Sequence, residues 1–125
     1  VNIVHKICMA VYYFHSFGIT HRDLKPENIL MTSTDDNADI KILDFGLSKI
    51  LENSKDKAYT LCGTLQYLAP EILKSRGYDK SVDWWSLGCI FYEMLTGKLP
   101  FRIKGNLINP NVFEEKIKLA RSLIF

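Results

Sequence analysis

His21-Arg22-Asp23-Leu24-Lys25-Pro26-Glu27-Asn28 is the stretch from which the fold of this chain can be argued. It combines carboxylates, cations, an amide and a proline, and apolar residues precede and follow it. A loop that is only solvated has no need of that mixture. The combination makes sense if Asp23 must accept a proton from a hydroxyl, Lys25 must face a phosphate and Asn28 must hold a metal ion.

The residues that follow this stretch are typical of a short β-hairpin. Residues 29–31 are apolar, residues 32–39 are rich in turn formers, and residues 40–43 supply the returning strand. Because Asn28 precedes the first strand and Asp44 follows the second, the hairpin brings both side chains to one edge of a small sheet. Two oxygen ligands placed in this way suit Mg²⁺, whose octahedron phosphate oxygens and water would complete.

Two long helices are predicted on either side of the hairpin. Apolar side chains at helical spacing predict a helix over residues 1–17, and Gly18 is suited to end it. Residues 81–96 are apolar nearly all round, which predicts a helix buried at the centre of the fold. We expect Trp84 and Trp85, near the start of this helix, to lie in the core.

The remaining segments are less regular. Residues 47–69 are expected to form a long irregular segment, followed by a short helix over about 70–75. Residues 102–111 are polar and are expected to form a loop. A final amphipathic helix is predicted from Val112 onward, with acidic residues in its first turn. The pattern as a whole is that of a mostly helical α+β fold.

Composition narrows the class of protein. The chain has 125 residues, 47% hydrophobic and 24% charged, which suits one globular domain. A net charge of +2 is too small to argue for nucleic acid or an anionic membrane as a partner, and no apolar run approaches a membrane span. The three cysteines form no CxxC pair, and their odd number favours a reducing compartment. We therefore expect an intracellular protein, in the cytoplasm or the nucleus.

Four motifs of the chain, in this order, resemble those of the eukaryotic protein kinase family: His21-Arg22-Asp23 with Lys25 and Asn28, Asp44-Phe45-Gly46, Ala69-Pro70-Glu71, and Asp83-Trp84-Trp85-Ser86-Leu87-Gly88. The resemblance covers essentially all 125 residues. It implies the fold of the large lobe of a kinase, in which a small antiparallel hairpin carries the catalytic and metal-binding loops.

No glycine-rich phosphate loop or upstream strand lysine is found in the sequence, and the terminal helices of the large lobe are also missing from the pattern. We therefore expect residues 1–125 to be part of a longer kinase domain. In the family, the glutamate at Glu71 pairs with an arginine outside this stretch, and loss of one member of a buried ion pair costs about 3–5 kcal/mol. The isolated chain is accordingly expected to be marginally stable and inactive.

The resemblance implies transfer of a phosphoryl group from ATP, with Mg²⁺, to a hydroxyl of a protein substrate. Asp23 would orient the substrate hydroxyl and accept its proton, and Lys25 would stabilise charge on the transferred group. Asn28 and Asp44 would bind Mg²⁺, and Leu30 would form part of the surface under the adenine.

Further matches concern the kinase group and its regulation. Lys25, two residues after the catalytic carboxylate, resembles the serine/threonine branch of the family. Residues 60–71 resemble the calcium/calmodulin-dependent-like kinases, especially checkpoint-type members, and the cyclic-nucleotide-dependent-like kinases. Thr60 matches the activation phosphosite, with Arg22 and Lys49 as basic partners of the phosphate. An upstream kinase, or another copy acting in trans, would phosphorylate it.

Other positions match residues that bind the protein substrate. Thr64 resembles the threonine that hydrogen-bonds Asp23 and Lys25 in serine/threonine kinases. Glu27 and Glu93 match positions that bind an arginine upstream of the acceptor residue. The resemblance therefore implies a preference for basic residues before the acceptor.

Three leucines, Leu61, Leu65 and Leu68, would form the walls of a pocket for the residue after the acceptor. Leu65 stands where these groups more usually have a proline, so we expect a less rigid loop. Two other residues are assigned structural roles. His21 is expected to be a buried packing and hydrogen-bonding group, and Asp83 to tie the central helix to the backbone of the catalytic loop.

Two alternatives to a protein kinase remain. The first is a pseudokinase, or a kinase-like fragment, that acts as a protein-binding module. Intact Asp23, Asn28 and Asp44 favour the enzyme, because a scaffold could lose them freely. The second is a small-molecule kinase of related fold. The Ala69-Pro70-Glu71 motif and residues 60–64 argue against it, since they build a platform for a protein substrate.

Overall fold

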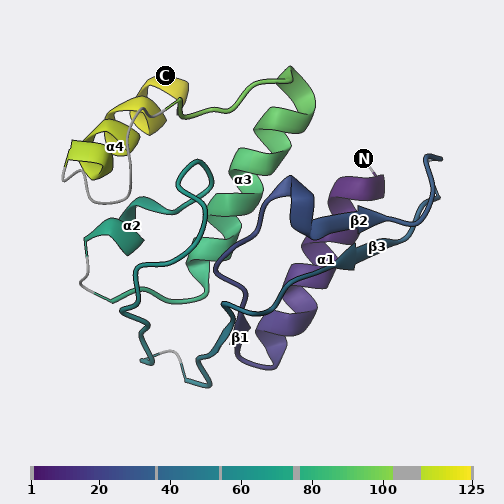
Figure 1. Cartoon of the computed structure of the whole chain (residues 1–125), viewed down its shortest axis with the longest axis horizontal. Helices are drawn as coiled ribbons and strands as arrows, with labels where there is room; N and C mark the ends of the chain where they lie inside the picture. Colours follow the sequence, from purple (N-terminus) through teal and green to yellow (C-terminus); the bar gives the residue numbers. More distant parts are fainter. Residues whose placement is uncertain (1, 36, 54, 75–76, 103–110, 125) are drawn as a thin grey trace.

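The computed structural model describes residues 2–35, 37–53, 55–74, 77–102 and 111–124 (Figure 1). Its regular secondary structure is mostly helical, with two small antiparallel strand pairs. The elements in chain order are α1 (Asn2–Ser16), β1 (Ile19–Thr20), the 3-10 helix η1 (Pro26–Asn28), β2 (Ile29–Met31), β3 (Ile40–Ile42), β4 (Lys49–Ile50), α2 (Pro70–Leu73), α3 (Ser81–Thr96) and α4 (Asn111–Ile124).

The first helix and its end agree with the sequence pattern. α1 buries one stripe of side chains, which includes Ile7 and Val11, against the rest of the core. Gly18 follows the helix with a φ of +72°, a left-handed conformation that glycine adopts without steric cost. A Cβ at Gly18 would also lie 3.0 Å from the backbone oxygen of Leu51, so the turn allows a close approach between two segments.

The predicted hairpin is present, and its register is set by three pairs of residues. Ile29 pairs with Ile42, Leu30 with Lys41, and Met31 with Ile40. A lysine of α1 holds the turn at the far end of the hairpin, because the Lys6 ammonium donates to the backbone oxygens of residues 37 and 38 at 2.9 Å and 2.7 Å. The hairpin is thus fixed against α1 at that end.

A second strand pair was not expected from the sequence. β1 pairs with β4, so that Ile19 lies opposite Ile50 and Thr20 opposite Lys49. Two-residue strands carry no readable periodicity, and the pairing joins residues that are 29 and 31 positions apart, so only tertiary structure defines it. The rest of the segment 47–69 contains no further strand among its described residues, as predicted.

The predicted central helix is α3, and Gly97 ends it with a φ of +67°. Its burial is less complete than expected. Trp85 is partly buried and stacks on Phe101, with 5.2 Å between ring centroids. Trp84, in contrast, is 41% exposed, so its assignment to the core was wrong. It lies on the side of α3 that faces His15, with 5.7 Å between the two ring centroids, and it belongs to neither core cluster of the described residues.

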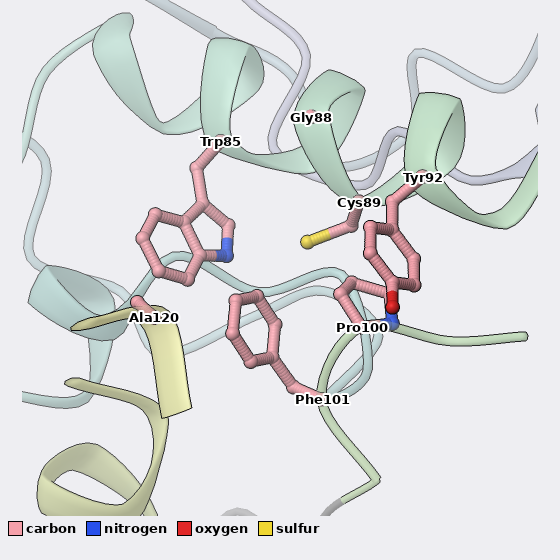
Figure 2. A pocket seen from close by; sticks show the side chains of 7 residues that line it. All are labelled: Trp85, Gly88, Cys89, Tyr92, Pro100, Phe101 and Ala120. Carbon is pink, nitrogen blue, oxygen red and sulfur yellow. The ribbon is translucent and has the colours of Figure 1, made fainter. Parts of the chain in front are cut away.

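Two clusters of buried side chains form the core. The larger joins α1, the loop that contains Leu24, and α3, and the smaller joins α2 and the segment before it to the start of α3. A cavity of about 250 Å³ lies between α3, the segment after it and α4, and Figure 2 shows the aromatic side chains that line it. α4 packs against α2.

Within the described ranges, no helix combines the length and apolar character that crossing a membrane requires. The polar loop predicted over 102–111 falls mostly on residues outside the described part of the chain.

Candidate active site

The central carboxylate of the site is oriented by two neighbours. Asp23 is only 9% exposed. Its Oδ1 accepts a hydrogen bond from the Thr64 hydroxyl at 2.7 Å, and its Oδ2 lies 3.2 Å from the Lys25 ammonium. The ammonium also donates to the Thr64 oxygen at 3.2 Å, which closes a triangle of three side chains. The contacts expected of Thr64 are therefore present.

Asp83 of α3 anchors the loop that carries this carboxylate, as the sequence suggested. Its fully buried carboxylate accepts hydrogen bonds from the backbone N–H groups of His21 and Arg22, both at 2.9 Å. His15 of α1 lies 2.8 Å from the same carboxylate through Nε2, a contact that the sequence did not reveal. Arg22 has a φ of +71°, a conformation that costs a non-glycine residue about 1–2 kcal/mol. The hydrogen bonds from the His21 and Arg22 N–H groups to Asp83 hold this strained backbone in place.

His21 is buried and serves to pack the site. Its exposure is zero, and Nε2 donates to the backbone oxygen of Leu43 at 2.9 Å. The ring also meets Phe45 edge to face, with 4.8 Å between centroids. This agrees with the expectation of a packing and hydrogen-bonding group, and it joins the catalytic loop to the segment after β3.

The hairpin places the backbones of the two predicted metal-binding residues, Asn28 and Asp44, at the same end of its two strands. The N–H of Leu43 donates to the backbone oxygen of Asn28 at 2.8 Å, so Asp44 follows directly after this contact. The Asn28 side chain is buried and donates through Nδ2 to the Asp23 carbonyl at 2.9 Å. That bond commits the nitrogen and leaves Oδ1 as the atom that could bind a cation.

Asp44 differs from Asn28 in being exposed, and its φ of +60° is left-handed. One of its carboxylate oxygens accepts the Gly46 N–H at 3.2 Å, which steadies the turn after β3. An amide oxygen and a carboxylate suit Mg²⁺ chemically, because Mg²⁺ prefers hard oxygen ligands and takes the rest from phosphates and water. Leu30, predicted to lie under the adenine, is on β2 with half of its side chain exposed.

The predicted phosphosite is linked to the catalytic loop through a tyrosine that the sequence did not single out. Thr60 is exposed, and its backbone oxygen accepts a hydrogen bond from the Tyr78 hydroxyl at 2.7 Å. Arg22 donates to the same hydroxyl at 3.2 Å and to the Leu47 backbone oxygen at 2.6 Å. Lys49, the second predicted basic partner, is exposed on β4.

The two predicted acidic residues act on a common tyrosine. The Tyr67 hydroxyl donates to a carboxylate oxygen of Glu93 at 2.6 Å. The pKa of Tyr67 is raised above its usual value, first by burial, then by the Glu93 hydrogen bond and charge, and further by the charge of Glu27. Both acidic side chains therefore influence this hydroxyl electrostatically, and Glu93 does so through a direct hydrogen bond.

The three leucines assigned to a substrate pocket differ in exposure. Leu61 is exposed, Leu65 is buried, and Leu68 is only 2% exposed within the smaller core cluster. Leu68 thus offers little surface to a substrate, and its side chain packs in the core below residues 61–68. Gly63, between these leucines, has a φ of +106°, and a Cβ there would lie 2.6 Å from the Arg22 carbonyl oxygen.

Comparison with known proteins identifies the family of the chain. A family model described as "Protein kinase domain" matches residues 1–123. The chain belongs to the protein kinase family. This kinase chain is 47% identical over 118 residues to "Serine/threonine-protein kinase AtPK1/AtPK6" of Arabidopsis thaliana, a match that covers 94% of the chain and 24% of that relative. It therefore spans about a quarter of that protein's length.

Two other relatives broaden the comparison. The kinase chain is 48% identical over 118 residues to "cAMP-dependent protein kinase, catalytic subunit-like" of Caenorhabditis briggsae, which covers 94% of the chain and 29% of the relative. It is 50% identical over 99 residues to human "Ribosomal protein S6 kinase alpha-2", which covers 79% of the chain and 13% of the relative. The resemblance to serine/threonine kinases, including the cyclic-nucleotide-dependent-like group, is thereby confirmed.

Proposed function

We propose that the protein carrying this chain is a serine/threonine protein kinase, which transfers the γ-phosphoryl group of ATP to a hydroxyl of a protein substrate. The observation that carries the proposal is the environment of Asp23. Its carboxylate is nearly buried, and Thr64 and Lys25 orient its two oxygens. The family and the names of the relatives support the same activity. We propose that the chain forms the core of the large lobe of an intracellular enzyme.

In this mechanism the substrate hydroxyl would hydrogen-bond to Asp23. Its oxygen would attack the γ-phosphorus as its proton passes to the carboxylate, the bond to the β-phosphate would break, and ADP would leave. The Thr64 hydroxyl restricts rotation of the carboxylate through Oδ1. Lys25 would counter the charge on the transferred group, since its ammonium lies beside the same carboxylate.

The metal-binding part of the proposal uses the two residues at the hairpin edge. Mg²⁺ bound with ATP would neutralise charge on the phosphates. Asn28 would present Oδ1, because its nitrogen is committed to the Asp23 carbonyl, and Asp44 would present its carboxylate. Leu30 would contribute apolar surface to the adenine site from β2.

We propose that Thr60 is the activating phosphosite, modified by an upstream kinase or by another copy in trans. A phosphate there would add nearly two negative charges close to Arg22, whose guanidinium already reaches the Tyr78 hydroxyl that holds the Thr60 backbone. Lys49 is the proposed second basic partner. Through Arg22, the phosphate would order the loop next to the catalytic carboxylate.

We further propose a preference for basic residues upstream of the acceptor, bound by Glu27 and Glu93. Its support is that both carboxylates raise the pKa of the same hydroxyl, that of Tyr67, which indicates that they act on a common part of the site. An arginine would compete with Tyr67 for Glu93, because the tyrosine hydroxyl already occupies one carboxylate oxygen. Leu61, which is exposed, and Leu65 would contact the residue after the acceptor.

The test compares the full-length protein with its Asp23→Asn variant on peptides that carry an arginine before the acceptor. Asp35→Asn, an exposed aspartate in the hairpin loop, is the matched control. We expect phosphate transfer from ATP by the wild type and the control, and at least a hundredfold loss for Asp23→Asn with thermal stabilisation by Mg²⁺–ADP retained. Nucleotide binding without transfer to any serine or threonine peptide would instead support a protein-binding pseudokinase.

A further inference from the structure

Lys116 of α4 is a lysine with no exposed surface. Its ammonium donates to the backbone oxygen of Leu65 at 2.7 Å and to that of Leu68. It also lies 6.0 Å from the centre of the Phe101 ring. The residue therefore reaches from α4, through an apolar environment, to the segment that follows Thr64.

Burial of a lysine is unfavourable unless hydrogen bonds to its ammonium group offset the loss of hydration. Burial lowers the pKa of Lys116 to about 8, although the charges of Cys89 on α3 and Glu71 on α2 raise it in part. An apolar side chain of similar length would fill the same space without that cost. An apolar replacement would lose the two hydrogen bonds to the Leu65 and Leu68 carbonyls. We therefore take these bonds to be the specific contribution of Lys116.

The environment of Lys116 includes a stacked aromatic pair. Trp85 and Phe101 stack in nearly parallel planes, 15° apart, and Figure 2 shows them beside Cys89 and Ala120 around the cavity between α3 and α4. α4 itself packs against α2. The lysine thus extends from a helix that packs against α2.

The segment held by Lys116 leads directly to the catalytic carboxylate. Leu65 follows Thr64, whose hydroxyl donates to Asp23 at 2.7 Å. At the other end of the segment, Leu68 is buried in the smaller core cluster. Displacement of the Leu65 carbonyl would therefore move Thr64, and with it both the carboxylate and the surface on which a substrate would lie.

We propose that Lys116 is a positioning residue for the protein substrate: its two hydrogen bonds fix residues 65–68, and thereby the site for the residue after the acceptor. This inference rests on the proposed kinase function. It assigns to α4 a role in substrate binding that operates through the backbone of another segment, without contact between Lys116 and the substrate.

The kinetic test uses Lys116→Met in the full-length protein, with Lys118→Met, an exposed lysine on the same helix, as the control. We expect the KM for a peptide to rise about tenfold and discrimination at the residue after the acceptor to fall, with the KM for ATP unchanged. The control should match the wild type. A purely structural role would reduce the active fraction and lower the apparent kcat at constant KM, which would overturn the proposal.

Amide hydrogen exchange tests the same inference without any enzymatic assay. The Tyr67 and Leu68 amides donate within the segment, to the backbone oxygens of Thr64 and Leu65. We expect their exchange to accelerate at least tenfold in Lys116→Met while exchange in α1 stays unchanged. If the wild type proved to lack kinase activity, the proposed function would fail and this measurement would still decide the role of Lys116.

A second variant covers the possibility that Lys116→Met does not fold. Lys116→Gln keeps an uncharged donor and should give an intermediate acceleration of the two amides. Unchanged exchange in both variants would overturn the proposal. Global unfolding of both variants would overturn it as well, because the lysine would then be required for the fold as a whole.

Discussion

Replacement of Asp83 by asparagine provides a demanding test of how the catalytic loop is held. The side chain keeps its shape and loses its charge and one acceptor. Asp83 receives the backbone N–H groups of His21 and Arg22 and the Nε2 of His15, all within 2.9 Å. Asparagine has only one acceptor oxygen, so in either orientation its NH₂ group must face at least one of these donors.

The expected loss follows from that count. If the amide oxygen takes the position of Oδ2, it keeps His21 and His15 and leaves the Arg22 N–H facing another donor. A hydrogen bond to a charged group contributes about 1.5–3 kcal/mol, and a buried donor without a partner costs a similar amount. We therefore expect Asp83→Asn to lower the free energy of unfolding by about 3 kcal/mol. Release of the strained Arg22 backbone should also displace Asp23 and reduce kcat at least tenfold.

Urea unfolding and peptide phosphorylation by the full-length protein would measure both effects. The control is Glu52→Gln, the same loss of charge at an exposed position, for which a change within about 0.5 kcal/mol is expected. If Asp83→Asn were as stable as this control and turned over at the wild-type rate, the argument that Asp83 holds the loop would be refuted.

Three further predictions concern neighbouring parts of the structure. Thr64→Val should reduce kcat at least tenfold because it removes the donor to the Asp23 carboxylate, whereas Thr64→Ser should retain most activity in the same peptide assay. Gly63→Ala should destabilise by at least about 2 kcal/mol in urea unfolding, since its Cβ would overlap a backbone oxygen; Gly88→Ala, with open space around it, should be neutral or slightly stabilising. Stability should also rise by roughly 1 kcal/mol between pH 8 and pH 9, because the unfolded chain keeps the proton on Lys116 while the folded chain, with a pKa of about 8, releases it. Above pH 9 the gain in stability should level off, because the folded chain keeps the Cys89 proton up to a pKa of about 11 while the unfolded chain loses it. A similar rise in the stability of Lys116→Met between pH 8 and pH 9 would contradict the assignment of this effect to Lys116.

The sequence predicted those parts of the fold in which local pattern and tertiary structure agree. The bounds of α3, the hairpin and the glycine turns at Gly18 and Gly97 follow from periodicity and backbone preference, and the structure confirms them. The pairing of β1 with β4 could not be predicted, since short strands depend on partners distant in the chain. The exposure of Trp84 likewise depends on which elements cover one side of α3.

The site divides in a similar way. The contacts of Thr64 and the burial of His21 were expected from the resemblance, while the roles assigned to the catalytic and metal-binding residues remain predictions. Tyr78 and Lys116 were missed for different reasons. Nothing in the sequence around Tyr78 distinguishes it from another turn residue. Lys116, in contrast, lies four residues before Ala120 on the apolar stripe of its helix, and a charged residue at such a position was a readable sign of a specific partner.

The glycine at position 63 has a consequence for protein engineering. The segment that contains the proposed phosphosite passes the catalytic loop at a distance that admits no side chain between the two backbones. Any side chain at position 63 would meet the Arg22 carbonyl oxygen, whatever residues 21–25 are. A chimera that took residues 60–68 from another kinase would therefore need a glycine at this position.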